Sequence, residues 1–380
     1  MAFIRVALYL HVPFCVKKCP YCDFYSLPHV PSSEEEKTYL QAVKTEVLYL
    51  KDFVEKLSGT ALNITTFYAG GGTPSLLSPG FYQEFFEFLS SQFRFTPVEL
   101  TLEANPDTIT LEKLKGFIET GFNRLSLGVQ SLSEKGLKTL KRTYQLKTAL
   151  KALDIASSLF SNLSVDFIFG WKGQGLKTLE EEIKKALSFS PTHLSFYELT
   201  LEHDVSFSGF SPNKPVDLFY RFIEHTLESQ GYLRYEISNY ARPGFECKHN
   251  LFYWEVKPYV GLGPSAVSRI ANLRWQNPQD LKAYVETLLN QKKLPLTPLE
   301  TLTPLEFAKE YVFMGLRLKK GIDLRTLSAK FGYYLDPWVL KNLIEKGLIE
   351  RKGNRVSLTS QGRLFHNQVV KLLWKTMEKA

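Results

Sequence analysis

Short apolar runs alternate with longer amphipathic stretches from residue 4 to about residue 200. Six runs are rich in β-branched and aromatic residues, as buried strands are, and they cover 5–12, 63–69, 98–104, 124–130, 163–170 and 193–200. The stretches between them have helical apolar spacing, for example at 34–57, 79–92, 110–120, 146–159 and 176–188. Six β/α units in series predict an α/β fold, a partial parallel β/α barrel with its helices outside.

The remainder of the chain follows a different pattern. Residues 206–298 are less regular, with a predicted helix at 214–229 and a strand around 234–240. From about residue 300 the pattern is helical, and it ends with a helix at 336–346, a hairpin turning at 353–354 and a helix at 360–377. That layout is typical of a winged helix. We therefore predict a barrel core (1–205), a middle extension (206–298) and a C-terminal winged-helix-like domain (299–380).

Composition adds little to this picture. The 380 residues carry a net charge of +8, and no apolar run approaches the ~20 residues that span a bilayer. The first residues show no secretory leader, so we expect a cytoplasmic protein. Aromatic residues make up 14% of the chain, which fits either large aromatic cores or apolar walls around a flat ligand.

Positive charge gathers near the end of the chain. Residues 341–380 hold nine Lys and Arg against three Glu, a net charge of +6. A solvated basic helix, transient membrane contact and an acidic partner all fit this charge. Charge alone is a poor sign of DNA binding, and we expect no nucleic acid partner.

Three cysteines lie in the run HVPFCVKKCPYCDFYS, directly after the first predicted strand. Cys15, Cys19 and Cys22 have the spacing C-x-x-x-C-x-x-C. Three thiolates can hold three irons of a cubane cluster and leave the fourth iron open to a small molecule. The alternatives are unrelated core cysteines or a zinc knuckle, but a structural zinc site normally has four ligands. The other cysteine, Cys247, is far along the chain.

Other polar and glycine residues fall at the ends of predicted strands. They are the glycine run 70–73, Glu103, Gln130 and Asp166, with Arg142 following the fourth strand. The carboxyl ends of parallel strands meet at one rim, where such barrels keep their chemistry. Each feature alone fits a tight turn or a structural hydrogen bond. Together they predict a ligand site at the rim.

The cysteine run, with Tyr21 between its last two cysteines, resembles that of the radical S-adenosylmethionine superfamily. The resemblance implies a [4Fe-4S] cluster whose open iron binds the cofactor's methionine group, and a reductant that drives formation of a 5′-deoxyadenosyl radical. The rim residues resemble the cofactor shell of oxygen-independent coproporphyrinogen III oxidase and its relatives. That resemblance implies S-adenosylmethionine contacts at Tyr9, Gly71, Gly72, Thr73, Glu103, Gln130, Arg142 and Asp166.

One position separates two branches of this family. The oxidase has a fourth cysteine two positions after the third, where this chain has Phe24, and it has more sequence ahead of the cysteines. Both departures resemble the HemW-type heme chaperones, which implies heme binding and delivery to acceptor proteins. The alternative is the oxidase itself, a decarboxylating dehydrogenase of porphyrin biosynthesis. Whether the chain is an enzyme stays open at this point.

A second motif of the same family lies in the middle region. His249, Tyr253 and Trp254 match its HNxxYW pattern. A neutral imidazole is a good axial ligand for heme iron, and the two aromatic residues could line the porphyrin. Cys247 is a further candidate ligand or attachment point. The alternatives are a structural histidine in an aromatic segment and a cysteine that serves as a small residue.

The chain departs from the family at two further places near the rim. Tyr144 stands where the family has a histidine after the Arg142 segment. Residues 170–175 read GWKGQG in place of the usual GLPGQT. These changes leave the cysteines intact and bear on the geometry around the cofactor.

Overall fold

Six parallel strands form the centre of the molecule. The computed structural model describes residues 3–201, 206–211, 215–296 and 299–379. Each of the six strands pairs with the next one along the chain, and every pairing is parallel. They are β1 (Phe3–Val12), β2 (Ala61–Gly71), β3 (Arg94–Ala104), β4 (Arg124–Gln130), β5 (Leu163–Phe169) and β6 (His193–Glu198). This confirms the predicted partial barrel.

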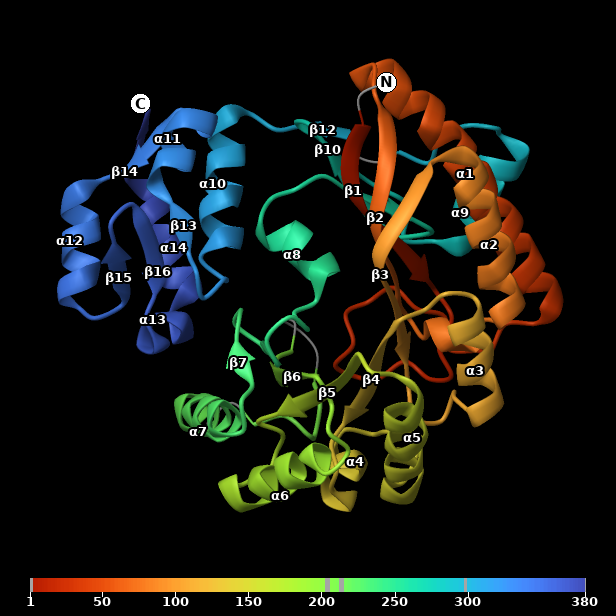
Figure 1. Ribbon diagram of the computed structural model, residues 1–380, viewed down its shortest axis with the longest axis horizontal. Coiled ribbons are helices and arrows are strands. Elements are labelled where there is room, and N and C mark those ends of the chain that lie inside the picture. The colour runs from red at the N-terminus through yellow and green to blue at the C-terminus, as the bar shows by residue number, and fades with distance from the viewer. Residues whose placement is uncertain (1–2, 202–205, 212–214, 297–298, 380) are drawn as a thin grey trace.

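Helices cover the outer face of this sheet (Figure 1). They are α1 (Ser33–Ser58), α2 (Pro79–Gln92), α3 (Leu111–Glu119), α4 (Glu134–Thr139), α5 (Leu146–Leu159) and α6 (Leu176–Leu187), with a 3₁₀ turn at Pro74–Leu76. Side-chain caps fix where several begin. Ser32 and Glu35 form a capping box at α1, and Ser78 and Thr110 cap α2 and α3.

The middle region extends both edges of the sheet. On one side, β9 (Tyr259–Leu262) pairs parallel with β1 and continues into antiparallel β10 (Val267–Ile270), β11 (Leu273–Gln276) and β12 (Leu299–Thr301). On the other side, β8 (Asn239–Ala241) pairs antiparallel with β6, and β7 (Leu233–Arg234) follows it. The strand predicted around 234–240 is thus two short strands. The predicted boundary at 205 falls beside residues 202–205, which lie outside the described residues.

Three helical elements of the middle region flank these strands. α7 (Val216–Ser229) precedes β7, and α8 (Lys248–Trp254) lies between β8 and β9. α9 (Leu281–Val285) runs into a short π-helical turn at Glu286–Asn290. In Figure 1, α8 lies between the strands and the C-terminal helices. None of the helices in the described part of the chain is long and apolar enough to cross a bilayer.

The C-terminal part has a separate hydrophobic core. Its elements are α10 (Pro304–Gly315), β13 (Ile322–Asp323), α11 (Leu324–Phe331), β14 (Tyr333–Leu335), α12 (Pro337–Glu345), β15 (Ile349–Lys352), β16 (Arg355–Leu358), α13 (Ser360–Leu364), α14 (His366–Lys375) and β17 (Met377–Lys379). The predicted hairpin is present as β15 and β16. The single helix predicted at 360–377 is wrong, because it breaks at Phe365 and its end pairs as β17 with β14.

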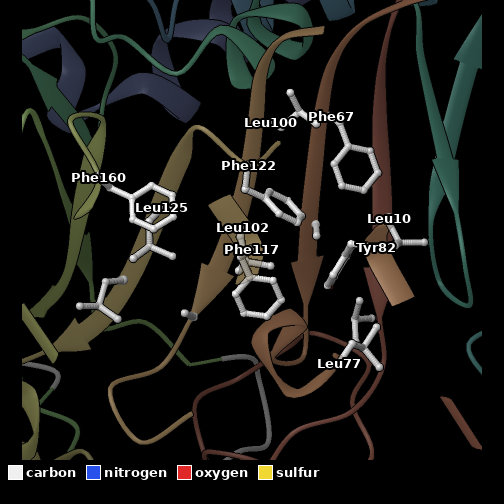
Figure 2. Packing of buried hydrophobic residues seen from close by; sticks show 14 of the residues in the cluster. Leu10, Phe67, Leu77, Tyr82, Leu100, Leu102, Phe117, Phe122, Leu125 and Phe160 are labelled. Carbon is white, nitrogen blue, oxygen red and sulfur yellow. The ribbon is translucent and has the colours of Figure 1, made fainter. Parts of the chain in front are cut away.

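Aromatic side chains fill the layer between the sheet and its outer helices. Figure 2 shows Phe67 of β2 among Tyr82, Phe117 and Phe122. The ring centroids of Tyr82 and Phe122 lie 4.9 Å apart in a T-shaped contact, which stabilises the core beyond the burial of area. The many Phe residues thus mainly serve the core. The convex face of the sheet packs against the helices, and the concave face carries polar side chains.

Candidate cofactor site at the rim of the barrel

The cysteine loop leaves the end of β1 and runs to the start of α1. Cys15, Cys19 and Cys22 are all partly exposed on it. The loop is anchored at its base, because the Cys15 amide donates to Leu27 O (3.0 Å) and the Cys22 amide donates to Cys19 O (3.1 Å). One short segment thus presents three accessible thiols at the end of β1.

Two donors from other elements approach these sulfurs. The Thr73 hydroxyl donates to Cys15 Sγ (3.2 Å), and Arg142 Nη1 donates to Cys19 Sγ (3.1 Å). Metal binding requires thiolates. Burial, followed by the nearby Cys19 and Cys15 sulfurs, raises the pKa of Cys22, although a Phe24 backbone hydrogen bond acts in the opposite direction. The Thr73 hydroxyl beside Cys15 and the Arg142 guanidinium beside Cys19 favour the thiolate form of these two cysteines, which is the form that binds a metal.

The cysteines fit a cluster better than a single metal ion. In the described ranges, no three His, Cys, Asp or Glu side chains converge as the ligands of one ion. This differs from a zinc knuckle, in which the ligands surround one atom. A cubane cluster binds each thiolate through a different iron, so its cysteines surround a group of atoms rather than a single ion.

The glycine turn at the end of β2 lies against the cysteine loop. The amides of Gly72 and Thr73 donate to Val12 O and Phe14 O, both at 2.7 Å. A Cβ at Gly72 would lie 2.4 Å from Phe14 O, and Gly71 has a φ of 105°. Only glycine tolerates this approach and this conformation. The turn therefore brings a bare backbone to the rim.

A partly buried carboxylate lies directly beneath this turn. Glu103 accepts hydrogen bonds from Tyr68 (2.7 Å) and from the Gly71 amide. Burial, followed in the same direction by the nearby Asp166, raises the pKa of Glu103 to about 7, even though both hydrogen bonds lower it. Asp166 lies within β5 rather than at its end, and it accepts from Ser126 (2.7 Å) and Ser164 (2.8 Å).

Arg142 joins the cysteine loop to the next strand ends. Its Nη2 donates to Asn105 Oδ1 (2.6 Å), and its Nε donates to the Tyr144 hydroxyl (3.1 Å). The Tyr144 hydroxyl in turn donates to Gly128 O (2.8 Å). Tyr144, which stands in place of the family's histidine, thus supports the arginine from a buried position. Gln130 ends β4 with a φ of 61°, an uncommon backbone conformation for a residue other than glycine.

The second departure from the family, GWKGQG at residues 170–175, forms a turn that a hydrogen bond holds across its ends. Gln174 Oε1 accepts from the Gly170 amide (2.6 Å), and Gln174 Nε2 donates to Glu182 (2.9 Å). Trp171 is buried beside Leu140 and Leu199. The glutamine that GWKGQG shares with GLPGQT therefore bridges the turn and α6.

Several side chains at this rim were not among the predicted contacts. Tyr68 and Ser126 hold the two carboxylates, and Asn105 links Thr73 (3.0 Å) to Arg142. Asn105 follows Glu103 in the sequence by two positions, so its place at a strand end was a usable signal. Tyr68 is one of 19 tyrosines and carries no local signal. The predicted contact Tyr9 lies beside it, with ring centroids 6.3 Å apart.

The HNxxYW segment forms α8 on the concave face of the sheet, and His249 is its buried residue. His249 is 1% exposed, and both of its ring nitrogens have partners: Thr66 Oγ1 at 3.0 Å and the Tyr253 hydroxyl at 2.9 Å. Burial, followed by the charge of Arg124, lowers the pKa of His249 to about 3. This neutral imidazole has no free nitrogen for an iron.

The other candidates around α8 also contact neighbouring parts of the chain. Cys247 is fully buried, and its thiol contacts Glu99 Oε1 at 3.5 Å. Tyr253 lies edge-on to Tyr259 of β9 with centroids 4.8 Å apart. Trp254 lies under the Arg317 guanidinium, 4.3 Å from the ring centroid. Both ring nitrogens of His249 are thus occupied, while Tyr253 and Trp254 stay partly exposed.

Comparison with known proteins places this geometry in a family. Residues 9–186 match the model of the radical SAM superfamily, and residues 302–365 match the HemN C-terminal domain. The heme chaperone HemW of Bacillus subtilis is 35% identical over 95% of this chain and 97% of its own length. The HemW of Haemophilus influenzae is 31% identical, with 97% of each chain covered. The chain belongs to the HemW family.

The fold has a solved counterpart outside the HemW family. Coproporphyrinogen III oxidase (HemN) from Escherichia coli has a TM-score of 0.81 to this chain, covering 97% of this chain and 90% of its own, at 23% identity. At this identity the likeness extends to the fold only. Membership of the radical SAM superfamily implies a [4Fe-4S] cluster and S-adenosylmethionine in this HemW relative, as the cysteine spacing predicted.

Proposed function

We propose that this chain binds heme and passes it to acceptor proteins, and that it holds a [4Fe-4S] cluster and S-adenosylmethionine at the barrel rim. The observation that carries the proposal is its near full-length similarity to curated heme chaperones of several bacteria. Phe24 supports it, since this side chain is 63% exposed where the oxidase is expected to have a cysteine. Heme is the cargo in this proposal, and the cluster and cofactor are resident.

The rim residues have distinct roles in this proposal. Cys15, Cys19 and Cys22 would hold the cluster through three of its irons and leave the fourth open to the cofactor. When bound, the two groups together supply reductive radical chemistry, which needs an external one-electron donor. Thr73 and Arg142 donate to the cysteine sulfurs and hold them in place.

The remaining predicted contacts surround the cofactor in this proposal. The glycine turn offers backbone groups to the methionine end, and partly buried carboxylates accept hydrogen bonds from hydroxyl or amino groups. These contacts are Tyr9, Gly71, Gly72, Glu103, Gln130 and Asp166. Asn105 and Tyr144 act through Arg142, which they orient.

The heme contact is a separate matter from the rim. Ligation by His249 stays a prediction from the family motif, and it requires that one of its two hydrogen bonds, to Thr66 or to Tyr253, breaks. The proposal therefore stands on heme binding and transfer by the whole chain and on no particular iron ligand.

Anaerobic cluster reconstitution, followed by two parallel assays, tests the proposal. We expect saturable heme binding, transfer of heme to an apoprotein such as apomyoglobin, and no porphyrin product from coproporphyrinogen III. Turnover of coproporphyrinogen III by protein with a full cluster would favour the oxidase instead. Failure to bind heme in the same preparation would overturn the chaperone.

A further inference from the structure

α8 is fixed to the concave face of the sheet at its first residues. The amides of Lys248 and His249 both donate to the Glu99 carboxylate at 2.9 Å. Glu99 is 2% exposed and lies in the middle of β3, the strand that carries Glu103 four positions further along. A carboxylate that accepts the free amides of a helix start holds that start firmly. The position of His249 is thereby set by β3.

His249 in turn packs on a tyrosine of the neighbouring strand. Its ring centroid lies 5.1 Å from that of Tyr68, with the planes tilted by 36°. Thr66, which bonds His249 Nδ1, precedes Tyr68 by two positions on the same face of β2. A neutral imidazole has one donor and one acceptor nitrogen, and both are occupied here. His249 therefore has a fixed ring orientation, and it confines the Tyr68 ring from one side.

Tyr68 ends at the carboxylate under the glycine turn. Its hydroxyl donates to Glu103 Oε1 at 2.7 Å, while the Gly71 amide bonds the same carboxylate. A Cβ at Gly70 would lie 2.9 Å from the Tyr9 ring and 3.0 Å from the Tyr68 ring. The two rings thus lie directly against the turn. Contacts are continuous from α8 through Tyr68 to Glu103.

We propose that Tyr68 and His249 are positioning residues for Glu103, so that α8 supports the S-adenosylmethionine site from inside the barrel. The inference rests on the cofactor role proposed for Glu103. This role is compatible with the hydrogen bonds that His249 makes through both ring nitrogens. Neither residue touches the cofactor in this arrangement, since each acts through the next.

The chemical consequence concerns the charge on Glu103. The Tyr68 hydrogen bond favours the ionised carboxylate, so its loss raises the pKa of Glu103 further. The titratable groups that face Glu103 are Tyr9, Tyr68, Tyr82, Arg124, Asp166 and Tyr197. Desolvation raises the pKa values of Tyr9, Tyr68 and Tyr82 above 10, so these three tyrosines stay neutral over the pH range of the test. A neutral Glu103 cannot accept hydrogen bonds as strongly as the carboxylate.

The test measures S-adenosylmethionine affinity by calorimetry between pH 6 and 9 on the cluster-reconstituted full chain. For Tyr68→Phe we expect about tenfold weaker binding, the size of one lost hydrogen bond to a charged group. The pH of half-maximal affinity should also move upward. Tyr232→Phe is the matched control, because Tyr232 is fully buried and its hydroxyl donates to Pro191 O, away from Glu103. The control should bind within twofold of the unsubstituted chain.

His249→Ala tests the second member of the pair. We expect weaker S-adenosylmethionine binding and an altered electron paramagnetic resonance signal of the reduced cluster with the cofactor present. Affinity within twofold and an unmoved pH profile in Tyr68→Phe would overturn the inference. So would an unsubstituted chain with a full cluster that binds no cofactor. Loss of heme from His249→Ala with full cofactor affinity would assign His249 to heme instead. If heme transfer fails while the cofactor results hold, the chaperone proposal fails alone.

Discussion

The rim of the barrel and α8 carry two motifs of the same family, yet they are built in opposite ways. At the rim, three thiols are partly exposed and face hydrogen-bond donors. At α8, the motif histidine is 1% exposed and both ring nitrogens are bonded within the chain. The rim therefore offers thiols that an added group can bind, whereas the motif histidine of α8 already uses both ring nitrogens within the chain. A shared motif therefore shows family membership, but it does not by itself show that the motif residue contacts a ligand.

The energetic reason lies in how polar groups are satisfied. A buried polar group without a partner costs about 1–3 kcal/mol, so a packed structure pairs its own groups wherever it can. Around α8 this pairing is extensive, and a ligand would have to break it. At the rim, burial and the neighbouring sulfurs raise the pKa of Cys22 and so disfavour its thiolate. A bound metal offsets this cost, because it takes the thiolate as a ligand.

Removing a rim thiol gives the largest effect that separates the two regions. Cys15→Ala, Cys19→Ala or Cys22→Ala should each abolish the intact cluster, because three cysteines are the whole protein ligand set. Iron and sulfide analysis with visible absorbance checks this. Cys247→Ala is the control and should retain four irons, since Cys247 lies buried at α8. Four irons in any of the first three variants would contradict the ligand assignment.

Cutting the anchor of α8 should weaken the fold by about 3–5 kcal/mol. Glu99→Ala leaves two amides without their acceptor and removes a carboxylate facing Arg124, which is itself 2% exposed. An uncompensated buried cation is costly. Urea unfolding of the metal-free chain measures the change.

A surface carboxylate provides the matched control for Glu99. Glu300→Ala removes the partner of Arg274 from a half-exposed pair and should cost less than about 1 kcal/mol. Equal losses in the two variants would mean that Glu99 does not hold α8 more firmly than a surface pair holds its strand.

Acid should loosen α8 by a smaller amount. The pKa of His249 is lowered from 6.5 to about 3 by burial and then by Arg124, so the unfolded chain binds the proton more readily than the folded chain. Stability is therefore lost as the pH falls below about 6.5 and until it reaches about 3. Between pH 7 and pH 5 this group should cost about 2 kcal/mol.

The variant His249→Gln isolates this contribution. Burial also lowers the pKa of His11 to about 4 and that of His193, so the unsubstituted chain loses stability from several groups. The difference in unfolding free energy between pH 7 and pH 5 should shrink by about 2 kcal/mol in His249→Gln. An unchanged difference would show that His249 is solvated rather than enclosed.

Periodicity predicted the six β/α units closely, because a buried parallel strand and an amphipathic helix each leave a local pattern. It failed at the end of the chain. The run 360–377 reads as one helix, but Phe365 breaks it and residues 377–379 pair with β14 instead. A strand that forms only against a distant partner leaves little local signal.

The sequence by itself determined the family, the order of the barrel strands and the thiol set. Cysteine spacing and strand ends are local properties of the chain, and the rim residues follow from them. Only the tertiary structure decided that His249 faces Thr66 and Tyr253, and that Tyr68 links α8 to Glu103. The hydrogen bond between Thr66 and His249 spans 183 positions, and no local spacing specifies such a pairing. Burial and hydrogen bonding settle whether a motif residue is open to a ligand, and both depend on the packed fold.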